Sequence, residues 1–241
     1  MTAPEDRPAR IHALIAAELR GADGSGDRLR QLCRFAVREL PASGAGVSLI
    51  TDAGTQGMAA ASDPTSEVVE ELQFTLGEGP CIDAHASRRP VLIPDLAEDA
   101  LTRWPAYVPA AREQGVQAVF AFPLQIGAAR LGTLDVYRDE VGSLSGEALD
   151  QALTCAEVAL MILLDEQDRA GPERMGAVAE SALGHRVELY QAQGMVQVQL
   201  GVSAAEAMVR LRAHAYANGY RLGDVARDVV TRRLSFERDT P

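Results

Sequence analysis

The sequence predicts an α+β fold with one central antiparallel sheet and flanking helices, followed by a long helix and a small three-helix unit. Two observations predict it. In residues 27–166, segments with apolar residues every three or four positions alternate with segments of period two, in the order helix, two strands, helix, strand, helix, two or three strands, helix. Residues 182–234 show only helical periodicity, between clear stop signals. We therefore expect a sheet domain followed by a helical one.

Composition indicates an ordinary globular protein of one or two domains. The 241 residues are 47% hydrophobic and 24% charged. No run of about 18 apolar residues and no signal-peptide core is found, so we expect a cytoplasmic protein that does not enter a membrane. Cys33, Cys81 and Cys155 lie far apart without a CxxC pair. This spacing indicates neither a disulfide framework nor a zinc site, and buried thiols are the simplest expectation.

Charge is unevenly distributed along the chain. The net charge is −11, which argues against nonspecific nucleic-acid binding by the whole protein. Residues 1–171 hold 14 arginines and 26 acidic residues, a net charge of −12, whereas residues 172–241 hold nine arginines and eight acidic residues, a net charge of +1. Every basic residue is arginine. The carboxy-terminal unit is thus nearly neutral on an otherwise acidic chain.

The amino-terminal third begins with two helices and continues into a hairpin. Apolar spacing predicts helices over residues 11–20 and 27–40, separated by the polar joint GADGSGD. From Gly44 the period changes to two, and GVSLITDAG and TQGMAAAS alternate around a turn at residues 52–54. Asp63 and Pro64 then form a cap and a first-turn proline for a helix over residues 65–74.

The middle of the chain combines a glycine-rich turn, short elements and the remaining strands. Gly77 and Gly79 in LGEGPCIDA allow a tight path into a short helix, and PVLIP is a short strand between prolines. A helix is expected over residues 104–114, and then two or three strands in VQAVFAFPLQ and IGAARLGTLDVYRDE, with Gly127 near the bend. A Ser145 cap begins a long helix to about residue 169.

This order of elements, together with LGEGPCIDA at 76–84 and the following VLIPD, resembles the GAF domain, a family of small-molecule sensor modules, over residues 27–166. The resemblance implies a ligand pocket on one side of the sheet, roofed by residues 74–85 and 96–114. The asparagine–lysine–phenylalanine–aspartate–glutamate pattern of cyclic-nucleotide-binding members is not found, so the sequence leaves the ligand unknown. The candidate pocket residues are Cys81, Asp83, His85, Trp104 and Tyr107.

Each pocket candidate also has a purely structural interpretation. Cys81 after Gly-Pro is typical of core packing, His85 of a surface or core-edge position, and Trp104 of a cover over the sheet. One branch of the family reduces free methionine sulfoxide with cysteine chemistry, which keeps a thiol enzyme as an alternative. Because only Cys81 lies near the expected pocket and a resolving partner is missing, we expect no catalytic residues.

The long helix carries a heptad-like seam with alternating steps of four and three. Such a seam is typical of a coiled coil, so we expect it to dimerise the protein, with packing on the sheet as the alternative. Gly171 and Pro172 mark a joint to the carboxy-terminal unit. The seam residues are Leu149, Leu153, Ala156, Leu160 and Leu163. The expected segments are 1–26 (helix and flexible joint), 27–146 (sensor), 147–171 (connecting helix) and 172–241 (three-helix domain).

Three helices follow the joint. The first places Leu183, Val187, Tyr190, Gly194 and Val198 on one expected apolar face and ends at Gly201. The second starts at Ser203, which forms a capping box with Glu206, and ends at Asn218-Gly219. The third runs from about residue 222 toward residue 234. Helices this short need support from the rest of the chain.

Residues 182–230 resemble an ANTAR domain, the RNA-binding module of bacterial transcription antiterminators. The matching positions are Arg186, Leu189, Ala192 and Gly194, then Glu206, Ala207, Leu211, Arg212 and Ala215, and finally Leu222, Val225 and Ala226. Gln193 stands where the family has lysine in an Ala-Lys-Gly triplet, which removes a charge. The implied RNA-binding residues are Arg186, Ala192, Gln193, Gly194, Arg212 and Arg221.

These side chains suit RNA, since arginines contact phosphates and tyrosines such as Tyr190 or Tyr216 stack on splayed loop bases. In the alternative interpretation the arginines are solvated and Tyr190 lies in the core. The combined prediction is a dimeric regulator whose GAF-like sensor reads a small-molecule or protein signal and whose ANTAR-like domain binds RNA hairpins in a nascent transcript. A helical DNA- or protein-binding regulator is the remaining rival.

Overall fold

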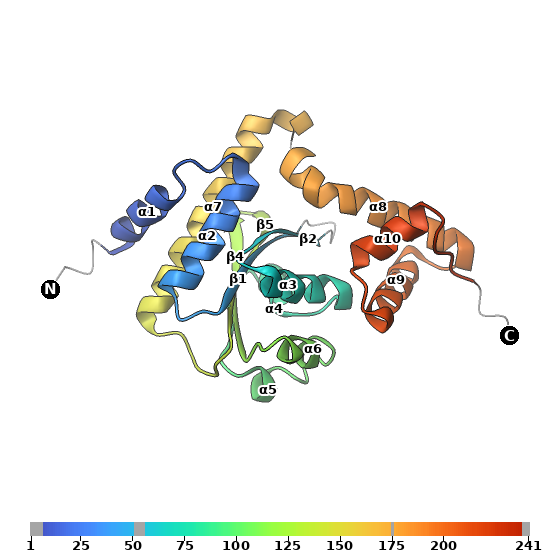
Figure 1. Ribbon diagram of the computed structural model, residues 1–241, viewed down its shortest axis with the longest axis horizontal. Coiled ribbons are helices and arrows are strands. Elements are labelled where there is room, and N and C mark those ends of the chain that lie inside the picture. The colour runs from blue at the N-terminus through green and yellow to red at the C-terminus, as the bar shows by residue number, and fades with distance from the viewer. Residues whose placement is uncertain (1–6, 51–55, 175, 238–241) are drawn as a thin grey trace.

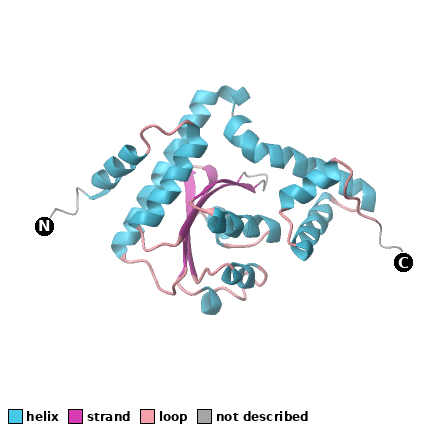
Figure 2. Cartoon of the chain, viewed as in Figure 1, coloured by secondary structure: helices cyan, strands magenta, loops and turns pink. Residues whose placement is uncertain are grey.

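The computed structural model describes residues 7–50, 56–174 and 176–237, and their side chains over residues 9–50, 57–166 and 188–237. Within these ranges, helices cover a single sheet, and a separate helical lobe follows at the carboxy-terminal end (Figure 1). Figure 2 shows the strands lying together at the centre of the first domain.

The sheet has five antiparallel strands in the order β2-β1-β5-β4-β3. The predicted α+β class with one antiparallel sheet is therefore confirmed. Two strands, β4 and β5, occupy the stretch in which two or three were expected, and the predicted turn at residues 52–54 lies outside the described residues. The strands are β1 (Gly44–Ile50), β2 (Gln56–Ala61), β3 (Val91–Ile93), β4 (Ala118–Ile126) and β5 (Ala129–Arg138).

Helices cover both faces of the sheet and form a separate core on each (Figure 1). The first face carries α1 (Arg7–Glu18), α2 (Gly24–Glu39) and α7 (Gly146–Arg174), and the second carries α3 (Pro64–Leu76), α4 (Pro80–Ser87), α5 (Leu96–Asp99) and α6 (Tyr107–Glu113). The four-residue α5 was not predicted. Its Asp95 cap accepts the backbone N–H of Ala97 at 2.9 Å, and four residues are too few to show a helical period.

The side chains of β5 point alternately into the two cores. Leu134 and Val136 face the core beneath α2 and α7, whereas Tyr137 faces the core beneath the second set of helices. Thr133 and Asp135 share the side of Tyr137 because side chains alternate along a strand. All three are buried, so polar groups enter the sheet on the α3 side.

Two glycines of β1 let α3 lie very close to the sheet. A Cβ at Gly44 would stand 2.3 Å from the Ser66 hydroxyl, and one at Gly46 would stand 2.2 Å from the Glu70 carboxylate. Because glycine has no Cβ, the strand leaves space there for both side chains of α3. The polar first turn of α3 is also fixed, since the Asp63 cap accepts the Ser66 N–H at 3.0 Å.

Helix α7 divides its apolar residues between the domain core and solvent. Ala156 and Leu163 of the predicted seam are buried in the core beneath α2, and Leu149 and Leu160 pack against that core. Leu153 of the same seam is 39% exposed. Met161, which lies further along α7 and outside the seam, is 58% exposed. The helix runs through the predicted joint at Gly171-Pro172 and ends at Arg174, so that joint is helical.

The carboxy-terminal lobe contains α8 (Gly176–Leu200), α9 (Ala204–Asn218) and α10 (Leu222–Val230), which share one apolar core. Ser203 caps α9 by accepting the Glu206 N–H at 3.2 Å, and Gly219 ends it in the left-handed conformation, as the sequence predicts. The Glu206 carboxylate does not complete the expected box. Instead it accepts the Arg210 Nε–H at 3.0 Å.

The predicted buried face of the first of these helices was wrong. Tyr190 is 48% exposed, Val198 is 78% exposed and Gly194 is exposed, whereas Ala192 and Val196 are completely buried. The side chains of Leu183 and Val187 lie outside the described residues. Apolar residues surround most of α8, so their spacing alone did not identify the side that packs on α9 and α10.

We predict that Gly132→Ala destabilises the sheet. A Cβ at Gly132 in β5 would stand 1.8 Å from the Ser48 carbonyl oxygen of β1, and neither backbone can yield without breaking the pairing. The free energy of unfolding should fall by about 3 kcal/mol. Urea unfolding followed by the fluorescence of Trp104, the single tryptophan, measures this change.

The matched control is Gly26→Ala in α2, where nothing lies within 4 Å of the added Cβ. This change should be neutral or stabilise the domain by up to about 1 kcal/mol, since alanine favours a helix over glycine. Equal effects of the two alanines would contradict the close approach of β1 and β5.

Candidate functional site

Five polar side chains form a buried cluster between α3 and the sheet, here called the interior polar cluster. Every member is at most 2% exposed. Glu70 and Gln73 lie one turn apart on α3, and the other members come from β1 and β5 on the same side of the sheet. The cluster consists of Ser48, Glu70, Gln73, Asp135 and Tyr137.

Hydrogen bonds connect both helical members of the cluster to the sheet. The Ser48 and Tyr137 hydroxyls both donate to the Glu70 carboxylate, the latter at 2.7 Å. The Gln73 amide donates to Asp135 Oδ2 at 2.7 Å, and its oxygen accepts the Cys81 N–H at 2.8 Å. Gln73 thereby connects α3, the start of α4 and β5.

The two carboxyl groups of the cluster hold their protons unusually tightly. Burial raises the pKa of Glu70 to about 7, although the hydrogen bonds from Ser48 and Tyr137 act in the opposite direction. Burial, and then the nearby charge of Glu70, raises the pKa of Asp135 well above its usual range. Two like charges in a dry interior oppose each other, so the pair favours a state with at least one proton bound.

Some polar atoms beside the cluster lack a partner among the described residues. They are Asp135 Oδ1, which belongs to the cluster, and the Tyr107 and Thr133 hydroxyls near it, all buried. An unpaired buried acceptor or hydroxyl costs free energy until a ligand, water or proton satisfies it. This interior therefore keeps unused hydrogen-bonding capacity, and it includes Tyr107 from the predicted pocket.

Three other predicted pocket residues, Cys81, His85 and Trp104, are buried around this interior. Cys81 packs in an apolar cluster with Ile50 and Phe74, and His85 is only 7% exposed. Trp104 is buried and meets Tyr107 edge to face, with ring centroids 6.1 Å apart. In this structure these side chains fill the region in which the sequence predicted a pocket.

Asp83 lies apart from the interior and fastens α4 to the segment before α6. Its Oδ2 accepts the Arg103 Nε–H at 2.6 Å and the Trp104 indole N–H at 3.1 Å. The Arg103 guanidinium also lies 4.9 Å from the Trp104 ring centroid. Through these two hydrogen bonds, Asp83 holds the segment before α6 against α4.

All three thiols are buried, and burial raises the pKa of each: Cys155 to about 12, Cys33 and Cys81 strongly. The reactive form of cysteine is the thiolate, which such surroundings suppress. The geometry therefore gives no support to the thiol-enzyme alternative.

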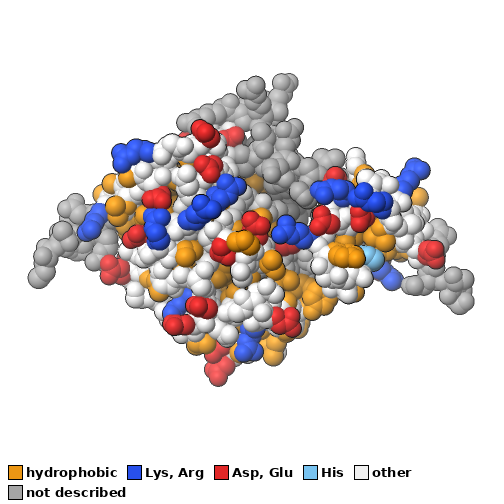
Figure 3. All heavy atoms as spheres, in the orientation of Figure 1, with side chains coloured by type: hydrophobic (Ala, Val, Ile, Leu, Met, Phe, Trp, Pro, Cys, Tyr) orange, Lys and Arg blue, Asp and Glu red, His pale blue; other side chains and the backbone are white. Residues whose placement is uncertain are grey.

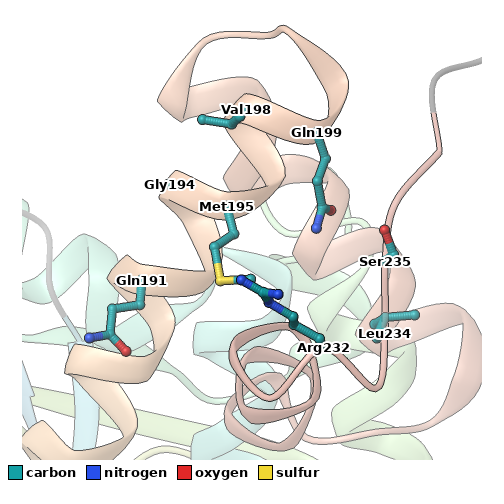
Figure 4. A pocket seen from close by; sticks show the side chains of 8 residues that line it. All are labelled: Gln191, Gly194, Met195, Val198, Gln199, Arg232, Leu234 and Ser235. Atoms are coloured by element: carbon teal, nitrogen blue, oxygen red, sulfur yellow. The ribbon is translucent and has the colours of Figure 1, made fainter.

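A groove of about 630 Å³ crosses the carboxy-terminal lobe, here called the α8 groove (Figure 4). One side is α8 and the other is the segment that follows α10. Figure 4 shows Arg232 extending toward Met195 across the groove floor, with Gln191 and Gln199 at opposite ends. The lining residues are Gln191, Gly194, Met195, Val198, Gln199, Arg232, Leu234 and Ser235.

The three residues at the family triplet have different surroundings. Gly194 is exposed in the groove wall, and nothing lies within 4 Å of where its Cβ would be. The Gln193 amide donates to the Ala204 carbonyl at 2.7 Å and so connects α8 to the start of α9. Ala192, grouped with the RNA-binding residues in the sequence analysis, is instead completely buried and packs the lobe.

Arg232 was not among the predicted contacts, yet it is the arginine of the groove. Its backbone adopts a left-handed conformation with φ of 60°, which a side chain with a Cβ resists. This conformation ends α10, because the Arg233 and Leu234 N–H groups both donate to the Asp228 carbonyl. In the sequence, the adjacent basic residues Arg232 and Arg233 were the only local sign of a contact site here.

The remaining predicted arginines have different positions. The side chain of Arg186 lies outside the described residues. Arg212 on α9 is partly buried against Gly77 of the sensor domain, and Arg221 lies 3.7 Å from Glu67 of α3. In Figure 3, blue and red side chains are interspersed over the carboxy-terminal lobe, in agreement with its small net charge.

Glu70 and Asp135 were not predicted from the sequence as site residues. The signal for Asp135 was the alternation of polar residues in TLDVY, with one acid inside an otherwise apolar strand. Among the described residues, three or more potential metal ligands do not gather anywhere, and no helix there has the length and apolar character to cross a bilayer.

Two family profiles match this chain, one over the sheet domain and one over the carboxy-terminal lobe. A GAF domain profile matches residues 26–163, and an ANTAR domain profile matches residues 177–230. Solved structures similar to this chain include the GAF domain of a phosphoenolpyruvate-protein phosphotransferase from Coxiella burnetii (17% identity, TM-score 0.53, 69% of this chain and 98% of that one). Another is the corresponding Acinetobacter domain (11% identity, TM-score 0.52, 70% and 98%). At such identities the likeness shows the fold. A search of curated proteins returns no match.

We predict that stability of the sensor domain falls with rising pH because of Glu70. Its raised pKa means that the folded chain binds more protons than the unfolded chain between pH 4.5 and about 7. The free energy of unfolding should therefore decrease through that window, by on the order of 3 kcal/mol. Glu70→Gln removes the ionisable group and should flatten this slope, as measured by urea unfolding at a series of pH values.

The raised pKa of Asp135 acts in the same direction, so a smaller slope should persist in the variant. Glu98→Gln, which removes one charge from an exposed position of α5, is the control. Coincident slopes for the wild type and Glu70→Gln would exclude this role of Glu70.

Proposed function

Because this chain belongs to the GAF domain family and carries an ANTAR domain behind its sensor, we propose that it is a signal-responsive RNA-binding regulator that acts by transcription antitermination. The GAF domain receives the signal in the cytoplasm. The ANTAR domain binds paired hairpins in the nascent RNA and holds a form that keeps a terminator from forming, so transcription continues.

The observation that carries the proposal is the α8 groove. Gly194 leaves the groove wall open at a position shared with the family. Gln191 places an amide at one end, and Gln199 at the other end accepts the Phe236 N–H at 3.0 Å. Amide groups hydrogen-bond the edges of unpaired bases, and the Arg232 guanidinium suits a phosphate or a base face. The groove also presents the apolar side chains of Met195, Val198 and Leu234, and such a surface suits the faces of bases that are splayed out in an RNA hairpin loop.

The small net charge of the carboxy-terminal unit supports a two-hairpin target. Residues 172–241 carry a net charge of +1, and Gln193 replaces a family lysine, so one domain gains little from counterion release. Two domains in one dimer raise the affinity through effective concentration when both hairpins lie on one RNA. Leu153 and Met161, exposed on α7, are the apolar residues available to a second copy there.

Direct binding tests the proposal. We expect the full-length protein to bind an RNA with two adjacent short hairpins more tightly than an RNA with one hairpin. Its affinity for either RNA should fall as the salt concentration is raised. Duplex DNA of the same length is the comparison. Fluorescence anisotropy across a salt series measures the affinity for the two-hairpin RNA, the one-hairpin RNA and the duplex DNA. Preference for the duplex would favour a DNA-binding regulator, and no binding to either hairpin RNA, with or without extracts that could contain the signal, would refute the RNA role.

Gly194→Leu separates RNA binding from folding. A Cβ added at Gly194 meets nothing within 4 Å, the position is exposed, and leucine favours a helix over glycine, so the ANTAR domain should remain folded. It narrows the α8 groove, and we expect RNA affinity to fall at least about tenfold, equivalent to one lost contact of roughly 1.4 kcal/mol. The control, Gly146→Leu, adds the same side chain at an open position of α7. Unchanged affinity in Gly194→Leu would exclude the groove as the RNA site.

A further inference from the structure

The structure shows the two domains in contact, and the geometry points to an autoinhibited arrangement. We propose that α3 of the GAF domain withholds Arg212 and Arg221 of the ANTAR domain from RNA until a signal releases them. Helix α3 contacts both α9 and α10, here called the α3 contact (Figure 1). The inference rests on the proposed RNA-binding function and adds its regulation.

Arg212 lies directly against the end of α3. Gly77 ends that helix with φ of 72°, and a Cβ placed there would stand 2.4 Å from Arg212 Nη1 and 2.9 Å from Cζ. The guanidinium thus occupies the space beside the glycine at the carboxyl end of a helix, where a positive charge is favoured. The next residue, Glu78, is fixed because its carboxylate accepts the Ala106 and Tyr107 N–H groups at 2.7 and 2.9 Å.

A second arginine faces the beginning of the same helix. Arg221 directly precedes α10, and its guanidinium lies 3.7 Å from the Glu67 carboxylate in the first turn of α3. Both side chains are partly exposed, so this pair contributes more to orientation than to stability. Arg212 and Arg221 therefore contact opposite ends of α3.

The environment of Arg212 is poorly suited to a permanent contact. Burial lowers the pKa of its guanidinium, and its buried Nε–H has no hydrogen-bond acceptor among the described residues. An apolar side chain would pack against Gly77 without leaving a donor unpaired. An arginine at this position therefore suits a side chain that leaves the α3 contact and finds its acceptors elsewhere, as phosphate oxygens would provide.

Helix α3 also faces the site where a signal would act. Its inward side carries Glu70 and Gln73 of the interior polar cluster, and its two ends carry Glu67 and Gly77 of the α3 contact. A ligand that changes the hydrogen bonds of Glu70 or Gln73 acts on the same rigid helix that covers Arg212. The shared helix gives the sensor a short physical route to the RNA-binding domain.

Gly77→Asn tests the contact with Arg212. Asparagine tolerates the left-handed conformation better than other residues with a Cβ, while its Cβ takes the space of the guanidinium. We expect the full-length variant to bind two-hairpin RNA about tenfold more tightly, as when a competent fraction near one tenth becomes dominant. The matched control is Gly127→Asn, which has a similar φ of 56° and nothing within 4 Å.

Glu67→Arg reaches the same contact without altering a glycine. It places a like charge beside Arg221 and should also strengthen RNA binding, whereas Glu98→Arg on α5 makes the same charge change away from the contact. This variant decides the outcome if Gly77→Asn fails to fold. Arg212→Ala in the Glu67→Arg background should remove the gain, because the released arginine is then missing.

An RNA-independent measurement follows the α3 contact itself. Spin labels on cysteines at exposed Val68 of α3 and exposed Ala205 of α9 report the distance between the domains, and the native thiols are buried. We expect one short distance in the wild type and a longer, broader one in both variants.

The outcomes separate this inference from the proposed function. A wild type that binds RNA as tightly as both variants overturns the autoinhibition and leaves the RNA role intact, as does the absence of a short distance in a wild type that binds RNA. If the labels show opening but no form binds hairpin RNA, the RNA role fails and the regulation fails with it.

Discussion

The close seating of α3 on the sheet is the constraint on which the rest of this structure depends. It is possible because β1 presents Gly44 and Gly46 to the helix, so Ser66 and Glu70 fit where side chains of the strand would otherwise stand. The helix then brings a carboxylate into a dry interior, where Ser48 and Tyr137 must satisfy it. A larger side chain on β1 would displace the helix, and with it everything attached to either end of α3.

Much of the sheet domain followed from its sequence because periodicity there is unambiguous. Period two predicted β1, β2, β4 and β5, and the caps at Asp63 and Ser145 marked where helices begin. The interior polar cluster did not follow in the same way. Glu70 and Asp135 are distant in sequence, and their proximity results from strand order and helix placement, which local patterns do not encode.

Surfaces were less predictable than elements in the ANTAR domain. Helix α8 is apolar on several sides, so the exposure of Tyr190 and Gly194 is decided by the position of α9 and α10 and not by spacing. Arg212 matched a family position, but its contact with Gly77 joins residues of two domains. Long-range contacts of this kind depend on how folded units meet, whereas capping at Ser203 depends on neighbouring residues and was correctly predicted.

Because the α3 contact joins two parts of one polypeptide, its strength does not depend on how much protein a cell contains. The ANTAR domain always encounters its own sensor at the same effective concentration, set by the chain that links them through α7 and α8. Under the proposed function RNA competes from outside, so its occupancy would vary with transcript abundance and with the number of hairpins on each molecule. If the proposed function and regulation hold, the closed arrangement would thus set a fixed threshold that scattered single hairpins do not pass and that a transcript with adjacent hairpins overcomes.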